Sequence, residues 1–481
     1  MNKNSNHSFI KDFFSLGIGS FLYLIIGLLG TPIITRLVDP VDYGQMSLLT
    51  VYSNLGMILC GLGLDQTLMR FFYQDKDIQY RRSLLKICYQ LPLIVSIASG
   101  SLFLIAYALG LRWISLTELV LLWINVIALL FNRISMLLLR MQYRTNAHSI
   151  INIIQKTTYI LLTVTLVLTV KTNHFIILAV STIASSLIAA LLSIFFERDH
   201  WHLPDPNYVF PIRHTQLLKY SLPFMLSGGI NVIFNALDKL FIDHFCTMTD
   251  VGIYASAMNM MAIFAVVRTS FNAIWMPSAV DHYETNPDDK SFFQSGHSFI
   301  SILMLCFGAT VILCKDLFVL LLGSRYQSAS VILPYLMFEP IMYTISETTA
   351  TGIVVQKKSS YQLIVSGVSC LVNFVGNWIL TPLMGPQGAA LSTGLSYIVF
   401  FILRTSFANR VFYVDYGLPR LTISVSALLA FAVFTSNTVF SLWYLIGYFL
   451  VMTIIIIAYR KNLRQAIQYA GSILNKVLKK T

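Results

Sequence analysis

The sequence predicts an all-α integral membrane protein with about fourteen transmembrane helices. Of its 481 residues, 56% are apolar and only 11% are charged, whereas roughly 25% are charged in an average soluble domain. Too few charges remain to cover a surface in contact with water. Apolar stretches of about 20 residues, each long enough to cross a hydrocarbon core roughly 30 Å thick, recur from end to end between short polar breaks. No room is left for a large soluble domain.

Charged residues, Pro, Gly and turn clusters mark the ends of the expected spans. The first apolar run follows the polar segment MNKNSNHS and lacks a small-residue cleavage site, so it is expected to remain as helix 1 rather than act as a signal peptide. The stretch 421–459 has no charge and is too long for one span, so a turn is expected at 436–438. The expected spans are 13–34, 43–71, 83–110, 115–140, 150–170, 173–196, 217–241, 251–278, 292–314, 330–354, 361–380, 388–403, 421–434 and 439–459.

Lys and Arg are distributed unequally between the two sides that these spans define. Of the 33 basic residues, 25 fall in the two tails and in the loops after even-numbered helices, five fall in the other loops, and three lie inside helices. Because cytoplasmic loops of membrane proteins carry an excess of Lys and Arg, both termini are expected to be cytoplasmic. The same distribution explains the formal charge of +12 without a nucleic-acid partner.

A short internal repeat suggests two halves. Asp42-x-Gly44 after helix 1 and Asp250-x-Gly252 after helix 7 match at an offset of 208 residues, and a repeat of six helices gives both halves the same orientation. The expected organisation is two six-helix lobes in parallel repeat plus a C-terminal helix pair. Its parts are an N-terminal lobe 1–197, a cytoplasmic linker and hinge 198–216, a C-terminal lobe 217–410, and the helix pair with a basic tail 411–481.

Four segments in register also carry a family resemblance. They are RLVDPVDYG at 36–44, LLLRMQYRTNAHS at 137–149, Asp238-Lys239 followed by Asp250-x-Gly252-Ile253-Tyr254, and TPLMGPQGAALSTG at 381–394. Together they resemble the polysaccharide transporter family, which includes flippases for O-antigen, capsule and teichoic-acid precursors. That family belongs to the multidrug/oligosaccharidyl-lipid/polysaccharide exporter superfamily. The pair Asp238-Lys239 departs from the family's commoner Asp-Arg pair.

The resemblance implies a flippase that translocates a lipid-linked oligosaccharide of the polyprenyl-pyrophosphate type from the inner to the outer leaflet by alternating access. It also implies a place in the bacterial cytoplasmic (inner) membrane, contact with membrane lipids, and polysaccharide polymerase and export machinery as partners. The alternative within the same superfamily is a cation-coupled multidrug or metabolite antiporter, whose cavity would be apolar with acidic ligands. A membrane-embedded polymerase or glycosyltransferase would need a sizeable outer loop, and every expected outer loop is short, so no enzymatic activity is expected.

Ionisable groups inside a bilayer cost about 2.5 kcal/mol or more and are usually kept for function. An anionic pyrophosphate would be bound by charge-assisted hydrogen bonds from a cavity of basic side chains. The candidates are Arg36, Arg133, Arg140, Lys156, Lys239 and Arg268.

Four of these six basic residues also have a structural alternative. Arg36 could cap the outer end of helix 1 beside its acidic neighbours, and Arg140, like Arg70, could reach into the lipid head groups. Arg133 lies seven residues before Arg140, so the two share a helix face. Lys156 and Arg268 are too deep to reach the head groups, and a neighbouring carboxylate is their alternative partner.

Four carboxylates are the candidates for ion coupling: Asp65, Asp238, Glu339 and Glu347. Either they bind a coupling H⁺ or Na⁺, or they neutralise an Arg across the bundle. Pro340 directly after Glu339 is expected to bend its helix. The nine histidines, including His200 and His202 in the linker, show no ligand spacing, so neither a metal nor a resident cofactor is expected.

Overall fold

A computed structural model describes residues 22–461, apart from 24, 112–113, 171–172, 262–263, 357 and 439. The regular structure of these residues is entirely helical, which confirms the predicted fold class. Among them, ten helices are long and apolar enough to cross a membrane, or eleven if the bent pair of α2 (Pro40–Gly61) and α3 (Leu64–Phe71) forms one span. The chain is a multi-pass membrane protein, and the count of fourteen stays a prediction.

Two shorter apolar helices lie where the first and last spans are expected. Ile25–Leu37 is the described end of the predicted helix 1, whose beginning at 13 lies outside the described residues, and α20 (Leu442–Ala458) is the last helix. The chain divides into two compact units, Met1–Leu240 and Phe241–Thr481. The division falls inside α9 (His214–Phe245). The lobe boundaries expected at 197 and 217 therefore stay a prediction.

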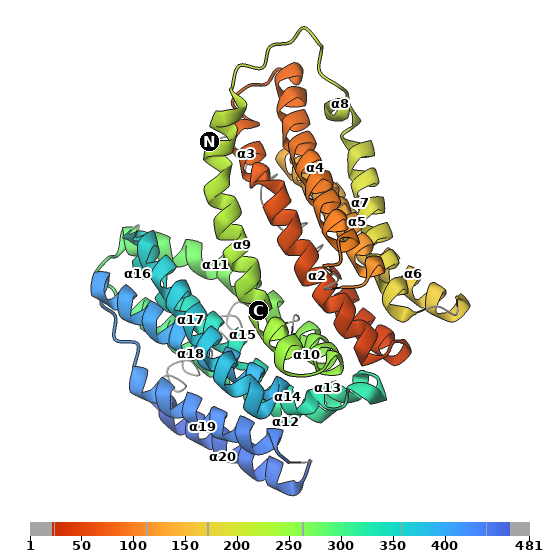
Figure 1. The fold of residues 1–481 in the computed structure, drawn as a ribbon. Helices are drawn as coiled ribbons and strands as arrows, with labels where there is room; N and C mark the ends of the chain where they lie inside the picture. The colour runs from red at the N-terminus through yellow and green to blue at the C-terminus, as the bar shows by residue number, and fades with distance from the viewer. Residues whose placement is uncertain are drawn as a thin grey trace, which may run out of the picture. The chain divides into compact units, whose positions relative to one another are not determined.

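In the first unit, α5 packs against α2, α4 and α7, and α6 packs against α7 (Figure 1). Helix α5 starts with a capping box in which Ser115 and Glu118 satisfy each other's backbone N–H groups. The bounds of the helices are α4 (Ile78–Ala108), α5 (Leu116–Met141), α6 (Thr145–Thr169) and α7 (His174–Phe196). These four helices agree with the predicted third to sixth spans.

The expected second span, 43–71, is broken by a bend of 53° between α2 and α3. Leu62 and Gly63 at the break have φ values of 52° and 68°, in the left-handed region. A Cβ at Gly63 would collide with the carbonyl oxygen of Ser221 in α9. The close approach of α9 therefore requires glycine, and the bend redirects the chain so that Asp65 lies in the first turn of α3.

The expected linker, 198–216, packs on α4 within the first unit. It begins with α8 (Arg198–Trp201), and the Trp201 ring lies 5.4 Å from that of Tyr89 in α4. Farther along, the Phe210 ring lies 5.1 Å from Tyr80, and the Asp205 N–H donates to Gln79 Oε1 at 2.9 Å. These contacts join the segment to α4, and its role as a hinge stays a prediction.

In the second unit, α18 packs against α14, α15 and α17 (Figure 1). Residues of the expected eighth span form α10 and α11, on either side of 262–263. The bounds are α10 (Met248–Met261), α11 (Phe264–Thr285), α12 (Ser291–Leu313), α13 (Lys315–Leu321), α14 (Ala329–Leu336), α15 (Phe338–Thr349), α16 (Thr351–Val355), α17 (Ser359–Met384), α18 (Pro386–Val411) and α19 (Leu418–Ser436).

The expected tenth span is interrupted at Met337, between α14 and α15. Pro340 in the first turn of α15 has no N–H to donate, and its ring conflicts with the carbonyl four residues earlier. By length and composition 329–349 still counts as one candidate span, so the bend expected at Glu339-Pro340 stays a prediction. A further break precedes α16.

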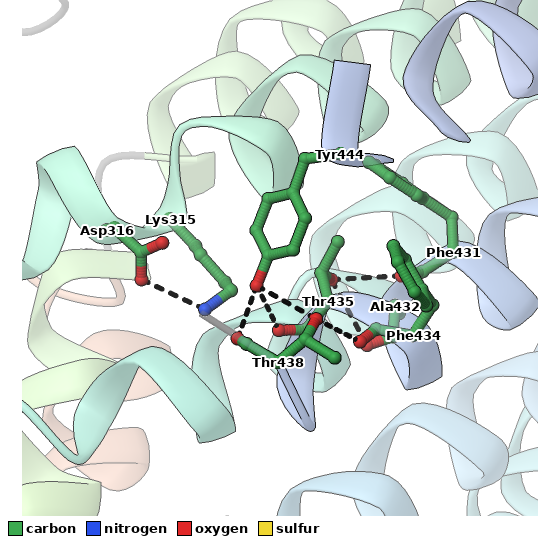
Figure 2. Close-up of polar contacts among 8 residues, drawn as sticks. All are labelled: Lys315, Asp316, Phe431, Ala432, Phe434, Thr435, Thr438 and Tyr444. Atoms are coloured by element: carbon green, nitrogen blue, oxygen red, sulfur yellow. Dashed lines mark hydrogen bonds and ion pairs between the residues drawn. The ribbon is translucent and has the colours of Figure 1, made fainter. Parts of the chain in front are cut away.

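The C-terminal helices α19 and α20 pack against each other, on α14 and α12 of the same unit. Figure 2 shows the end of this pair next to the turn, where the Tyr444 hydroxyl donates to the carbonyls of Thr435, at 2.8 Å, and Thr438. The Tyr444 ring lies 5.6 Å from the ammonium of Lys315, which is only 2% exposed and pairs with Asp316 at 2.9 Å. Helix α19 ends at Ser436, which confirms the expected turn.

Candidate functional site

Lys156 lies in the middle of α6 and is half-buried between two aromatic rings. Its ammonium is 5.6 Å from the centroid of Tyr159 and 5.8 Å from that of Tyr23, at cation–π distances. A Cβ at Gly27 would lie 3.2 Å from its Cε, so the absence of a side chain there makes room for the lysine. No acidic partner of Lys156 lies among the described residues. Its charge is therefore held by rings and not neutralised by a carboxylate.

Arg133 and Asp65 form an ion pair between α5 and α3. Arg133 Nη2 and Nε donate to Asp65 Oδ2 at 2.9 and 3.3 Å, and the Arg and Asp side chains are 56% and 21% exposed. A basic candidate and an acidic candidate, 68 positions apart in the sequence, thus neutralise each other. This geometry matches the structural alternative for Asp65.

The other basic candidates of the first unit lie near helix ends or on α9. Arg36 near the end of Ile25–Leu37 and Arg140 in the last turn of α5 have exposed side chains, and neither forms an ion pair within the described part of the chain. Arg133 is exposed on the same helix as Arg140, as their spacing predicts. On α9, Asp238 is buried and Lys239 is half-buried, and adjacent residues on a helix do not face each other.

Arg268 on α11 lies over an aromatic platform in the second unit. Its guanidinium carbon is 4.6 Å from the centroid of Tyr343 in α15, and the Tyr343 ring stacks on Phe400 of α18 at 5.6 Å with an interplanar angle of 14°. Among the described residues, the guanidinium has neither a carboxylate partner nor a hydrogen-bond acceptor. The ring fixes the position of the guanidinium and leaves its N–H groups available for a ligand.

A buried ion pair between Glu347 of α15 and Arg404 of α18 lies next to this platform. Arg404 Nη1 donates to Glu347 Oε1 at 2.8 Å and to Ser346 Oγ at 2.9 Å, and the Arg and Glu side chains are 9% and 3% exposed. The Arg404 guanidinium also lies 5.5 Å from the ring of Phe400. The pair joins α15 to α18 next to Tyr343.

Sequence reasoning missed Arg404. The twelfth span was expected to end at 403, which placed Arg404 in a cytoplasmic loop, but α18 continues to Val411. One available signal was the spacing of Tyr397, Phe400 and Arg404, which puts all three on one helix face. The other was Glu347, because a carboxylate inside a span calls for a basic partner.

Glu339 joins the same region from the first turn of α15. The Tyr397 hydroxyl of α18 donates to Glu339 Oε1 at 3.5 Å, and the Tyr397 ring lies 6.3 Å from that of Tyr343 at an interplanar angle of 60°. The structure thus brings Arg268, Glu339 and Tyr343 together with Tyr397 at the meeting point of α11, α15 and α18.

A separate buried polar network joins α17 to α18. Asn373 Nδ2 donates to Thr393 Oγ1 at 2.9 Å, Ser392 Oγ donates to the Asn373 carbonyl at 2.9 Å, and Thr381 Oγ1 donates to Asn377 Oδ1 at 2.9 Å. Within a membrane such groups need internal partners, and these residues supply them to one another. In the described ranges, no group of three or more His, Cys, Asp or Glu side chains is arranged to hold a metal ion.

The comparisons with known proteins agree on the fold. The model of a family described as "Polysaccharide biosynthesis protein" matches residues 9–281. No curated protein sequence is significantly similar to the chain. Among solved structures, an inward closed conformation of lipid II flippase MurJ is 15% identical, with a TM-score of 0.69, and the match covers 94% of this chain and 99% of MurJ.

Two transporters of the MOP superfamily are also similar. An outward-facing multidrug resistance transporter of the MATE family is 14% identical, with a TM-score of 0.55, and a MOP superfamily transporter from Pyrococcus furiosus is 13% identical, with a TM-score of 0.55. Each match covers 86% of this chain and 96% of the other chain. These structural likenesses establish the fold, and the family model covers more than half of the sequence. The chain therefore belongs to the polysaccharide biosynthesis protein family and has the fold shared by lipid II flippase MurJ and the MATE transporters of the MOP superfamily.

Proposed function

We propose that the protein is a flippase that moves a lipid-linked oligosaccharide, attached through pyrophosphate to a polyprenyl lipid, from the inner to the outer leaflet. The head group enters a cationic cavity from the cytoplasmic leaflet, the cavity then opens outward by alternating access, and the lipid tail stays in the bilayer. The family description and the fold of a lipid II flippase support a substrate of this class. The proposal includes the cytoplasmic membrane of a bacterium, with both termini on the cytoplasmic side.

The observation that carries the proposal is which of the basic side chains within the spans have a carboxylate partner. Arg133 and Arg404 are neutralised by carboxylates, whereas Lys156 and Arg268 are held over aromatic rings without an acidic partner among the described residues. A positive charge inside a membrane without a counter-ion is expensive unless it faces water or a ligand. An anionic pyrophosphate would supply that counter-charge through charge-assisted hydrogen bonds.

The test is reconstitution of the protein in vesicles with a fluorescent polyprenyl-pyrophosphate oligosaccharide. The rate at which the label reaches the outer leaflet is compared for the intact protein, Arg268→Ala and Lys156→Ala. Loss of one charge-assisted interaction is expected to slow transport about tenfold or more. Arg198→Ala and Lys76→Ala are matched controls, because both side chains are exposed outside the apolar helices, and both are expected to keep the original rate.

Equal rates in all five proteins would contradict the role of the cationic side chains. If the intact protein moved cationic dyes but no polyprenyl-linked molecule, the antiporter function would replace the flippase. Imposed H⁺ and Na⁺ gradients identify a coupling ion. Ion binding at Asp65 or Glu347 would have to break an existing ion pair with Arg133 or Arg404.

A further inference from the structure

We propose that Glu339 and Tyr397 bind the sugar next to the pyrophosphate, while Arg268 on its Tyr343 platform binds the phosphates. This inference rests on the proposed function and divides the substrate between two neighbouring groups of side chains. According to this inference, residues of the second unit determine the specificity for the saccharide.

The first observation is the exposure pattern of α15. Every residue of this helix is buried except Glu339 and Tyr343, which are half-buried and lie four residues apart on one face. The accessible surface of α15 is therefore one strip, which consists of the Glu339 carboxylate and the Tyr343 ring. The strip is where a polar ligand can contact α15.

The second observation is that two other helices bring complementary groups to this strip. Arg268 comes from α11, and its guanidinium carbon lies 4.6 Å above the Tyr343 ring. Tyr397 comes from α18, with its ring 6.3 Å from Tyr343 and its half-buried hydroxyl 3.5 Å from Glu339. The guanidinium of Arg268 and the phenol of Tyr397 therefore lie beside the Tyr343 ring, and the Glu339 carboxylate lies beside Tyr397.

The chemistry of these groups fits a sugar joined to a pyrophosphate. A guanidinium donates two parallel hydrogen bonds to phosphate oxygens, whereas a carboxylate can only accept, so it takes hydrogen bonds from sugar hydroxyls. The electron-rich face of an aromatic ring attracts the C–H edge of a pyranose. In such a lipid the first sugar is bonded to the phosphate, so both must be recognised side by side.

The alternative is a purely structural role, in which the Tyr397–Glu339 hydrogen bond only joins α15 to α18. At 3.5 Å this hydrogen bond is near the limit of useful length and contributes little. The same two helices are already joined by the buried Glu347–Arg404 pair at 2.8 Å. The Glu339 side chain is only half-buried, and its carboxylate can accept hydrogen bonds from sugar hydroxyls.

The experiment compares two lipids in the same vesicles: polyprenyl pyrophosphate carrying the oligosaccharide, and polyprenyl pyrophosphate without sugar. Glu339→Gln and Tyr397→Phe are expected to slow flipping of the oligosaccharide lipid about tenfold and to change flipping of the sugar-free lipid less than twofold. Arg268→Ala is expected to slow both. Glu284→Gln and Tyr413→Phe are the matched controls, since both side chains are exposed in the same unit.

The outcomes separate this inference from the proposed function. If the intact protein moves neither lipid, the flippase proposal fails. If it moves both and Arg268→Ala slows both, but Glu339→Gln and Tyr397→Phe behave like the intact protein, only the sugar site is wrong. Equal slowing of both lipids by these two variants would show a structural role, and Glu339→Asp, which keeps the charge, is expected to recover part of the oligosaccharide rate.

Discussion

Replacing Glu347 by Gln would leave the guanidinium of Arg404 buried without its counter-charge. Breaking a buried pair by removing one partner costs about 3–5 kcal/mol. The geometry favours the upper part of that range, because the Arg and Glu side chains are 9% and 3% exposed and Arg404 Nε already lacks an acceptor among the described residues. At about 2–4 °C per kcal/mol for a unit of this size, the midpoint of thermal unfolding should fall by roughly 10 °C.

The assay is the fraction of detergent-solubilised protein that stays monodisperse after heating. Membrane proteins unfold irreversibly, so all variants are compared at one heating rate. Asp65→Asn is the matched control. Its ion pair with Arg133 is more exposed, with 56% of the Arg and 21% of the Asp side chain accessible, so it should contribute at most about 1 kcal/mol to the free energy of unfolding. The double variant Glu347→Leu with Arg404→Met removes both charges and should recover most of the loss.

Two results would refute this reasoning. One is a Glu347→Gln protein whose unfolding midpoint lies within about 2 °C of that of the original protein. Such a small fall is what the loss of an exposed ion pair would cause, and not the loss of a buried one. The other is a double variant as unstable as either single variant. The register of α15 and α18 would then depend on shape complementarity and not on charge.

Three further predictions concern the backbone, the terminal helices and the orientation. Gly63→Ala should lower the unfolding temperature by several degrees, because the left-handed φ and the approach of α9 both oppose a side chain, whereas Gly229→Ala, with open space around its Cα, should not. Tyr444→Phe should cost about 1–2 kcal/mol by the same heating assay, because the ring over Lys315 remains but two hydrogen bonds are lost. Epitope tags at both termini should be inaccessible to antibodies in intact cells and accessible after permeabilisation; labelling of either tag in intact cells would contradict the charge distribution.

The helices could be predicted from the sequence because a lipid core demands long apolar runs, whatever their neighbours are. The described helices α4 to α7 follow the expected spans within a few residues. The end of α18 could not be located in this way, because a charge at Arg404 predicts the first residue of a loop, whereas α18 continues to Val411. A charge ends a span only when it has no partner, and the partner, Glu347, lies 57 positions earlier in the chain.

The candidate site was predictable in composition but not in pairing. Lys156 and Arg268 stood out because they lie deep in apolar runs, yet no sequence signal joins Asp65 to Arg133 or Glu339 to Tyr397. Those contacts depend on how separate helices pack. The bend between α2 and α3 did have a local signal in Gly61-Leu62-Gly63, which a reading based on apolar length alone passes over.

The environment of Lys315 is completed only when the last helix, α20, has been made. Helix α13 is made well before α20, and until α20 inserts, the ammonium of Lys315 has Asp316 beside it but no Tyr444 ring over it. A chain that stops short of the last helix would display that charge at the edge of the hydrocarbon. The last helix to be made therefore completes the burial of a charge that an earlier part of the chain contributes.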